Sequence, residues 1–254
     1  MDIKELDLSK PLNRNLKKGQ DPDKYSSELK KYHRCIWSNR KLGNDYFTLI
    51  DDGENRLKYS NGDVEIVFTP DSITNSFRFS KRKTKINGKT ESELISEFIE
   101  QDDEIDSLLK EYKEKDYQIS SSIIFPISIN GLNLRWTLNI ARGILYKVHD
   151  RIDLTLECIR RYYQEPNEYN PLKSSIDRNI EFFKLFNKFE DYVDFFFLNC
   201  FLDEKGRIKG LTGTLDFESS FPETKEQYKT YLKNTLEFME VRKNDMGEWI
   251  DNKN

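Results

Sequence analysis

The feature that most constrains the fold of this chain is a stretch near its middle, residues 150–163, where apolar and charged residues recur at helical spacing. When the stretch is placed on a helix at about 100° per residue, one face is apolar and contains Ile152, Leu156, Ile159 and Tyr163. A second apolar side, with Leu154 and Cys158, lies nearly opposite. Because a solvated helix normally has a single apolar face, the pattern predicts a helix enclosed on two sides by the rest of the protein.

A narrow stripe of charged residues, Asp153, Glu157 and Arg160, runs between these two apolar sides. Charges withdrawn from water must be paired, and the stripe has two interpretations. The first is a structural ion-pair network, in which Arg160 and an arginine from elsewhere, such as Arg135 or Arg142, neutralise the two carboxylates. Networks of this kind are the common use of such stripes.

The second interpretation is a cleft that binds an anionic ligand. Arginine forks bind phosphate groups in a bidentate manner, and a carboxylate held nearby can act as a general base or a metal ligand. Nucleotides and phosphodiesters fit this chemistry best. The candidate substrate-binding residues are Arg135, Asn139, Arg142, Arg151 and Arg160. The candidate catalytic residues are Asp153, Glu157 and His149.

His149 and Gly143 each also have a plainer interpretation. His149 directly precedes Asp150 and Arg151, and a histidine in a charged cluster can titrate near neutral pH, although a plain structural or surface histidine is the commoner case. Gly143 could let the backbone approach an anion at a helix N-terminus. More often a glycine in this position only permits a tight turn.

Composition argues against several classes of protein. The chain of 254 residues has 41 basic and 45 acidic residues and a net charge of −4. This is not the basic balance of a general DNA-binding domain, although a local basic patch is compatible with it. The cysteines, Cys35, Cys158 and Cys200, are far apart among apolar neighbours, which indicates buried reduced thiols. The chain has two histidines, so we expect no histidine-based zinc site and predict no metal ligands.

The sequence shows neither a signal peptide nor an apolar run long enough to cross a membrane. We therefore expect a cytoplasmic protein without a membrane partner. The short motifs of P-loop NTPases, Rossmann dehydrogenases, zinc proteases, serine hydrolases and EF-hands are also missing. The cofactor, if there is one, is unknown from the sequence.

Local patterns predict an α+β fold, with a small, mostly antiparallel sheet packed by several helices and a helix-rich C-terminal half. Strands are expected within residues 45–79, ending with Phe77–Phe79, and within 120–138. Asn61-Gly62 and Asn130-Gly131 predict hairpin turns, and Pro126 predicts an edge strand or a bulge. The expected helices are 25–37, 91–112 with an interruption at 100–104, 144–164, 176–201 and 223–242.

These elements predict one domain over residues 25–242, with an N-terminal arm or loop at 1–24 and a frayed C-terminal tail at 243–254. The helix expected at 176–201 is rich in phenylalanine. Its rings are expected in the core, and an aromatic surface for a partner protein is the alternative.

Several ordered elements of the sequence resemble an uncharacterised bacterial family that is described as a domain of unknown function. The most specific is the run from Asp150 to Tyr163, DRIDLTLECIRRYY. The others are Asp21-Pro22-Asp23, Tyr32-His33, Trp37-Ser38, Phe125-Pro126, Asn139 with Ala141-Arg142-Gly143, Pro171-Leu172, Phe182-Phe183 with Leu185-Phe186, and Tyr192 to Phe196. The resemblance covers roughly residues 21–242. It implies a bacterial or phage source and a single full-length domain, and it implies no reaction.

Two hypotheses about function follow. The first is an effector or enzyme that acts on nucleotides or RNA through the arginine and carboxylate cleft, with a role in phage defence or as a toxin by analogy with other unassigned bacterial families. The second is a non-catalytic protein-binding or regulatory module, with a protein partner or a second copy of the chain on the aromatic helix or the N-terminal arm. A closed network of Asp153, Glu157 and Arg160 would favour the second hypothesis.

Overall fold

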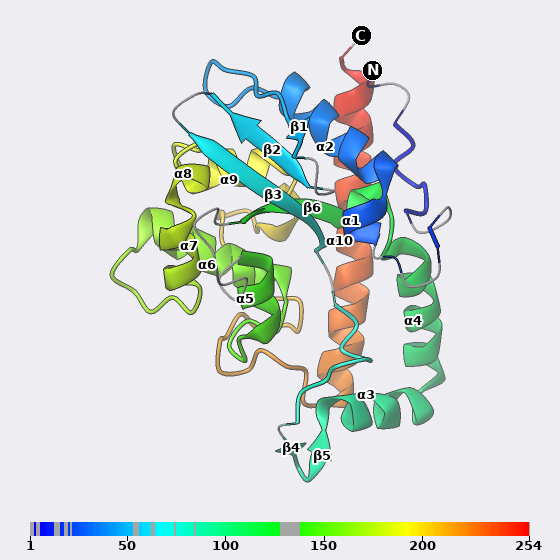
Figure 1. Cartoon of the computed structure of the whole chain (residues 1–254). Helices are drawn as coiled ribbons and strands as arrows, with labels where there is room; N and C mark the ends of the chain where they lie inside the picture. Colours follow the sequence, from blue (N-terminus) through cyan, green and yellow to red (C-terminus); the bar gives the residue numbers. More distant parts are fainter. Residues whose placement is uncertain are drawn as a thin grey trace.

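The computed structural model describes residues 3, 6–12, 16–17, 20, 22–52, 56–61, 64–73, 75–83, 85–127 and 138–253, without the side chains of Asp23, Lys24 and Asn139. Its architecture is α+β, as the sequence predicts: a four-stranded antiparallel sheet, a separate two-stranded hairpin and surrounding helices (Figure 1). The long helix α10 (Lys225–Asp251) runs along the molecule past the sheet (Figure 1).

The sheet has the order β1-β2-β3-β6, and its neighbouring strands are antiparallel. Its strands are β1 (Ile50–Asp51), β2 (Leu57–Ser60), β3 (Glu65–Ser72) and β6 (Ser122–Ile127). The separate hairpin consists of β4 (Lys85–Ile86) and β5 (Lys89–Thr90). Most residues of β3 and β6 are buried, so the core of the protein packs on these two strands.

Two turn and edge predictions for the sheet are confirmed. The hairpin predicted at Asn61-Gly62 joins β2 to β3, with Leu57 opposite Phe68, although Gly62 itself lies outside the described residues. Pro126 lies on β6, which is an edge strand of the described sheet, where a missing backbone N–H is tolerated. The hairpin predicted at Asn130-Gly131 lies outside the described residues.

Helix starts in the first half of the chain follow the sequence signals. The helices are α1 (Pro22–Tyr25), α2 (Ser27–Asn39), α3 (Glu91–Glu100) and α4 (Asp103–Lys115). The hydroxyl of Ser26 caps α2 by accepting a hydrogen bond from the Leu29 amide. The helix predicted over 91–112 is interrupted where expected, because Thr90 caps α3 and Asp102 caps a second helix start at α4.

The helix predicted over 144–164 is wrong in its first part. The helices of this half are α5 (Leu138–Ile144), α6 (Ile152–Gln164), α7 (Lys173–Arg178), α8 (Ile180–Phe183) and α9 (Phe189–Phe195), followed by α10. The chain leaves α5 and makes a turn over residues 145–151 before α6 begins. His149 and Asp150 in this turn have φ angles of +52° and +58°, which a right-handed helix cannot accommodate.

The phenylalanine-rich helix predicted over 176–201 is also wrong as a single element. It divides into α7, α8, α9 and the 3-10 turn η4 (Asn199–Phe201). Folding back on itself lets its rings converge, with Phe186 5.5 Å from Phe182 and 5.8 Å from Phe196 between ring centroids. The phenylalanines of this segment are buried. The core interpretation is confirmed, and the segment presents no aromatic surface to a partner.

The described termini pack more closely than the sequence suggests. Helix α10 continues past its predicted end because Met246 and Ile250 are buried, so the frayed tail is a wrong prediction for residues 243–251. In the N-terminal arm, Ile3 and Leu8 are buried in the core. Both chain ends lie at the same end of the molecule (Figure 1).

A buried arginine, Arg242, connects α10 to the sheet through hydrogen bonds. Arg242 donates hydrogen bonds to the backbone carbonyls of Ser120, Ser122 and Phe196, the latter two at 3.0 and 3.2 Å. The first two carbonyls belong to the 3-10 turn η2 (Ile119–Ser121) and to β6. Of the helices described, none is both long and apolar enough to span a membrane.

Candidate functional site

Helix α6 is enclosed on both sides, as its two apolar faces predict, and residues 152–159 are buried. At its start, Arg151 and Asp153 form an ion pair in which both side chains are 0% exposed, with Nη2 2.5 Å from Oδ2. The same Oδ2 accepts a hydrogen bond from the Leu211 amide at 2.8 Å, and Arg151 donates to the Thr214 carbonyl. This pair is closed against its own protein and leaves no room for a ligand.

The second half of the charged stripe is also paired. Glu157 accepts hydrogen bonds from Arg160 at 2.8 and 2.9 Å and from Arg161 at 2.7 Å, and Arg160 also reaches Glu165. Burial raises the pKa of Glu157, but the two guanidinium groups outweigh burial and hold this pKa below its ordinary value. The geometry favours a structural network, while catalytic roles for Asp153 and Glu157 stay predictions.

Of the other arginines predicted to bind a substrate, Arg142 is among the described residues and Arg135 is not. Arg142 on α5 is fully buried; its Nε donates to the Thr155 hydroxyl at 2.8 Å and its Nη1 to Asp71 at 3.0 Å. Its guanidinium also lies 4.5 Å above the ring of Phe125. The guanidinium of Arg142 is therefore engaged by groups of the protein itself and is not presented to a ligand. Arg135 and the side chain of Asn139 lie outside the described residues, so their predicted roles stay predictions.

The turn between α5 and α6 contains a predicted catalytic residue that borders a cavity, His149. The turn is fixed by backbone hydrogen bonds, among them Asp150 N–H to the Arg142 carbonyl at 2.9 Å. Histidine and aspartate tolerate the left-handed conformation better than most residues. Phe77, whose ring lies 6.4 Å from that of His149 between centroids, has a φ of +58°, which is strained for a bulky side chain. Strain of this kind concentrates at functional sites.

Both ring nitrogens of His149 are engaged. Nε2 lies 2.9 Å from Oε1 of Glu91 and 3.1 Å from Nη1 of Arg82. Nδ1 lies 2.7 Å from the Ser220 hydroxyl and 2.6 Å from the Tyr146 carbonyl. Contacts on both sides fix the orientation of the ring, which is the arrangement expected of a group that moves a proton.

Glu91 reaches His149 because of how α3 begins. Thr90 and Glu93 form a capping box, which places Glu91 in the first turn with its carboxylate buried. Burial raises the pKa of Glu91, but hydrogen bonds from His149 and from Ser80, the latter at 2.6 Å, outweigh it and hold this pKa below its ordinary value. The carboxylate is therefore ionised at neutral pH and can accept a hydrogen bond when Nε2 of His149 carries a proton.

Arg82 connects the two sides of this site. Its Nη2 donates to the Gly143 carbonyl at 2.6 Å, at the C-terminal end of α5, and its guanidinium lies 4.5 Å over the ring of Tyr146. Gly143 thus lies within a helix end and does not form an anion-binding helix start. Asp150 is 29% exposed beside this group; burial raises its pKa above the ordinary value, against the opposing charges of Arg142 and Arg82.

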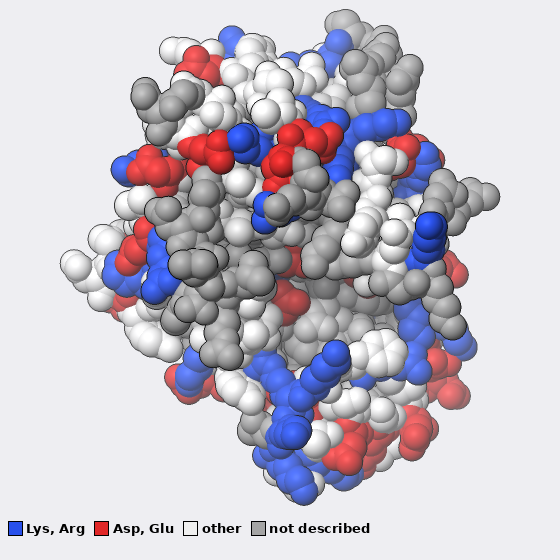
Figure 2. Space-filling view, in the orientation of Figure 1, with Lys and Arg blue, Asp and Glu red and all other residues white. Residues whose placement is uncertain are grey.

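These residues border a cavity of about 610 Å³, which we call the His149 pocket; it is lined by parts of segment 75–83, by Glu91 and by the turn after α5. Its volume lies within the range of sites for drug-sized ligands, roughly 300–1,000 Å³. At its mouth Phe79 is 78% and Tyr146 50% exposed, and Lys81 and Lys83 are exposed beside them. Figure 2 shows lysine and arginine side chains gathered on this part of the surface, over the β4–β5 hairpin.

Sequence reasoning identified His149 but missed its partners. Arg82 and Glu91 lie 67 and 58 residues away along the chain, and their contacts with the imidazole depend on tertiary packing. The available signal was the basic stretch of residues 81–90 directly after an exposed phenylalanine. In the described part of the chain no cluster of His, Cys, Asp and Glu is arranged to hold a metal ion.

The model of a family of unknown function (DUF6994) matches residues 6–246. The chain belongs to this family. Its resemblance to a domain of unknown function, noted from the DRIDLTLECIRRYY run, is thereby confirmed, and the match includes α6 and all residues that line the His149 pocket. No curated protein and no solved structure matches the chain. Membership of the family therefore supplies no reaction, and function has to be inferred from the site.

Proposed function

We propose that this member of the family acts on nucleoside phosphates, either free nucleotides or single-stranded RNA, at the His149 pocket. One observation carries the proposal: exposed aromatic rings and exposed lysines share the mouth of a cavity that has a buried histidine, a buried glutamate and a half-buried arginine at its floor. The proposal keeps the ligand class expected from sequence. It moves the ligand from the stripe on α6 to the turn that precedes it.

The mouth of the pocket has the groups that bind a nucleotide without a sequence motif. Bases stack on exposed aromatic side chains, which contribute roughly 1–3 kcal/mol per base, and Phe79 and Tyr146 are available for this. Lys81 and Lys83 supply positive charge for phosphate groups. Among the described residues neither lysine has an ion-pair partner.

The floor of the pocket has the groups that general acid–base catalysis needs. In cleavage of an RNA phosphodiester by its own 2′-hydroxyl, one group removes the hydroxyl proton and another gives a proton to the departing 5′-oxygen. Ionised Glu91 suits the first role, and His149 in its doubly protonated form suits the second, since it becomes a neutral imidazole when its Nε2 proton passes to the 5′-oxygen. The 2′-oxygen forms its bond to phosphorus as the bond from phosphorus to the 5′-oxygen breaks. Arg82, beside both, would stabilise the additional charge on the phosphate oxygens.

Binding is tested by titrating a fluorescent single-stranded RNA, and separately ATP and AMP, with the full chain. Phe79→Ala should weaken RNA binding by roughly 5- to 150-fold, the equivalent of one lost stacked base. Tyr46→Ala, which removes another exposed aromatic side chain, is the matched control and should change nothing. Equal affinities for the wild type and Phe79→Ala, or no binding at all, would contradict the proposal.

The electrostatic contribution is tested with the Lys81→Ala/Lys83→Ala variant at several salt concentrations. Removing two phosphate contacts should reduce the slope of log K against log salt by roughly 1 to 1.5. The control is Lys110→Ala/Lys113→Ala, which removes two lysines from α4. A wild-type slope in the Lys81/Lys83 variant would show that these lysines do not contact phosphate.

The reaction is tested by mass spectrometry of RNA and nucleotides after incubation with the protein. His149→Ala should abolish product formation while RNA binding is retained. If the wild type binds RNA and forms no product, the protein is a nucleic-acid-binding module and the catalytic part of the proposal is wrong. A role in phage defence or as a toxin would be supported by growth arrest on over-production that His149→Ala removes.

A further inference from the structure

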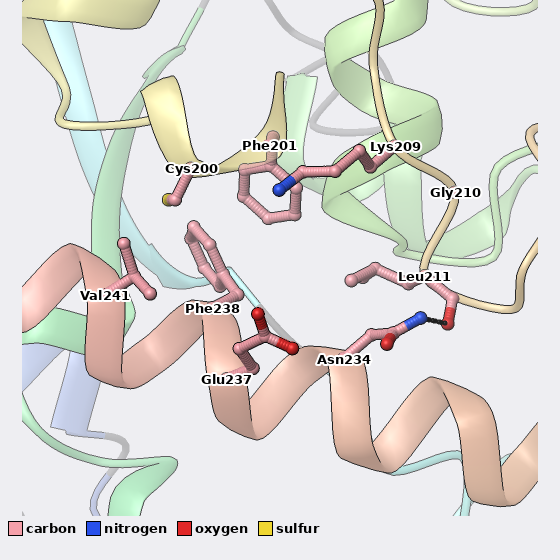
Figure 3. Close-up of a pocket in the computed structure, with 9 residues that line it drawn as sticks. All are labelled: Cys200, Phe201, Lys209, Gly210, Leu211, Asn234, Glu237, Phe238 and Val241. Carbon is pink, nitrogen blue, oxygen red and sulfur yellow. Dashed lines mark hydrogen bonds between the residues drawn. The ribbon is translucent and has the colours of Figure 1, made fainter. Parts of the chain in front are cut away.

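A second cavity, which the proposed function does not use, lies between η4, the loop at 209–211 and α10 (Figure 3). Its volume is about 200 Å³, below the roughly 300–1,000 Å³ of sites for drug-sized ligands. A nucleotide is therefore too large for it. We call it the α10 cavity, and its size restricts the ligand to a small molecule.

One side of the α10 cavity is apolar. The ring of Phe201, from η4, and that of Phe238, from α10, lie with centroids 3.8 Å apart, and both are buried. Leu211 and Val241 extend the apolar lining at either end. A short aliphatic or aromatic group would lose its contact with water here, at a gain of about 25 cal/mol per Å² of apolar surface buried.

The other side of the cavity has two opposite charges. Lys209 extends from the loop over Phe201, and Glu237 projects from α10 on the facing side (Figure 3). Neither is within ion-pairing distance of the other, and within the described chain neither forms an ion pair elsewhere. A cation and an anion that face one cavity without neutralising each other are complementary to a ligand with both charges.

The backbone that follows the exposed Lys209 is held by close contacts and hydrogen bonds. A Cβ atom on Gly210 would lie 2.1 Å from the carbonyl oxygen of Thr214, so only glycine fits this close approach. Gly213 N–H donates to the Gly210 carbonyl at 3.0 Å, and Leu211 is held by the buried carboxylate of Asp153. Asn234 on α10 donates to the Leu211 carbonyl at 2.9 Å (Figure 3). A preformed wall reduces the entropy lost on binding.

We propose that the α10 cavity binds a free α-amino acid with an apolar side chain. The carboxylate of the ligand pairs with Lys209, its ammonium group pairs with Glu237, and its side chain lies against Phe201 and Phe238. Cys200 also borders the cavity, but burial raises the pKa of its thiol to about 12, so it contributes an apolar surface and no reactive thiolate.

The proposal is tested by calorimetric titration of the full chain with L-leucine and L-phenylalanine. Leucinamide, which lacks the carboxylate, N-acetyl-leucine, which lacks the ammonium group, and glycine, which lacks the side chain, serve as comparison ligands. Each should bind at least tenfold more weakly than L-leucine. Equal affinities for L-leucine and leucinamide, or no binding of L-leucine at millimolar concentration, would overturn the proposal.

Variants assign the binding to this cavity. Lys209→Ala and Glu237→Gln should each weaken L-leucine binding by roughly tenfold or more, because each removes a charge-assisted hydrogen bond. Lys205→Ala and Glu248→Gln, at exposed positions in the preceding loop and on α10, are the matched controls. Val241→Trp fills the cavity from a half-exposed helical position and should abolish binding with an unchanged circular dichroism spectrum. Unaltered binding in all three cavity variants would place the ligand elsewhere and contradict the proposal.

Discussion

Two buried side-chain pairs meet at the turn before α6 and differ in what surrounds them. Arg151 and Asp153 are sealed in the interior, where their side chains bond to each other, to three backbone carbonyls and to one backbone amide. His149 and Glu91 form a similar contact, but theirs borders the cavity of the His149 pocket. Burial and access, and not residue type, separate a structural pair from a candidate site.

The turn between α5 and α6 produces this difference. Two successive residues with positive φ, His149 and Asp150, redirect the chain, so His149 faces the pocket while Arg151 points into the interior. Ser220 joins the two groups, because its hydroxyl contacts the imidazole and its carbonyl accepts a hydrogen bond from Arg151. The Arg151–Asp153 pair thereby positions Ser220, which in turn contacts the imidazole of His149.

The largest effect is expected from breaking the closed pair. Asp153→Asn leaves the Arg151 guanidinium buried without a counter-charge, which should lower the free energy of unfolding by roughly 3–5 kcal/mol. Urea unfolding followed by circular dichroism measures it. The double variant Arg151→Met/Asp153→Leu is the control, since replacing both charges with apolar groups should restore most of the loss. A loss below about 1 kcal/mol in Asp153→Asn would mean that water reaches this pair.

A smaller effect is expected in the open group. Glu91→Gln removes the charged acceptor of His149 and Ser80 and should lower the free energy of unfolding by roughly 1–3 kcal/mol. The loss is smaller than for Asp153→Asn because water from the pocket can replace the lost bonds. The same denaturation experiment compares the two. If Glu91→Gln lowers the free energy of unfolding as much as Asp153→Asn does, water reaches the His149 pocket no better than it reaches the Arg151–Asp153 pair.

The pH dependence of the unfolding free energy tests the contacts of Glu91 in the open group. The pKa of Glu91 is held below its ordinary value of 4.5, so its ionised form stabilises the fold above that pH, and this contribution is lost as the pH falls through the lowered pKa. The difference in unfolding free energy between the wild type and Glu91→Gln should therefore shrink between about pH 6 and about pH 3. A difference that stays constant over this range would show that the Glu91 carboxylate gains nothing from its partners.

The smallest effect is expected at the exposed end of α6. Glu165→Gln removes one partner of Arg160, which keeps Glu157, and should leave the free energy of unfolding nearly unchanged, because exposed ion pairs contribute little. High salt should remove the difference. A loss of several kcal/mol in the free energy of unfolding would show that the closed network of ion pairs reaches the surface at Glu165.

Local signals in the sequence were enough for much of the fold. Three features each follow from neighbouring residues: the pairing of β2 with β3, the interruption of the helix expected at 91–112, and the enclosure of α6. The turn before α6 could not be predicted because residues 144–164 keep an apolar pattern compatible with one helix, and only the packed structure holds His149 and Asp150 at positive φ.

The candidate site was only partly accessible from the sequence. The sequence predicts that the stripe on α6 is at least partly buried and paired, and Asp153 and Glu157 are both. The ligand that the same stripe suggests stays a prediction. The structure instead joins His149 to Glu91 and Arg82, which come from segments that sequence spacing alone does not bring together. A single sequence cannot reveal such contacts, because they depend on how α3 packs beside the turn.

Photo-crosslinking of an RNA that contains 4-thiouridine, followed by mass spectrometry of the linked peptides, would locate the nucleic-acid surface. If the His149 pocket is the site of action, crosslinks should fall on the peptides that contain Phe79 and Tyr146 and disappear on competition with unlabelled RNA. Competable crosslinks confined to residues 157–165 of α6, or none on the pocket peptides, would contradict it.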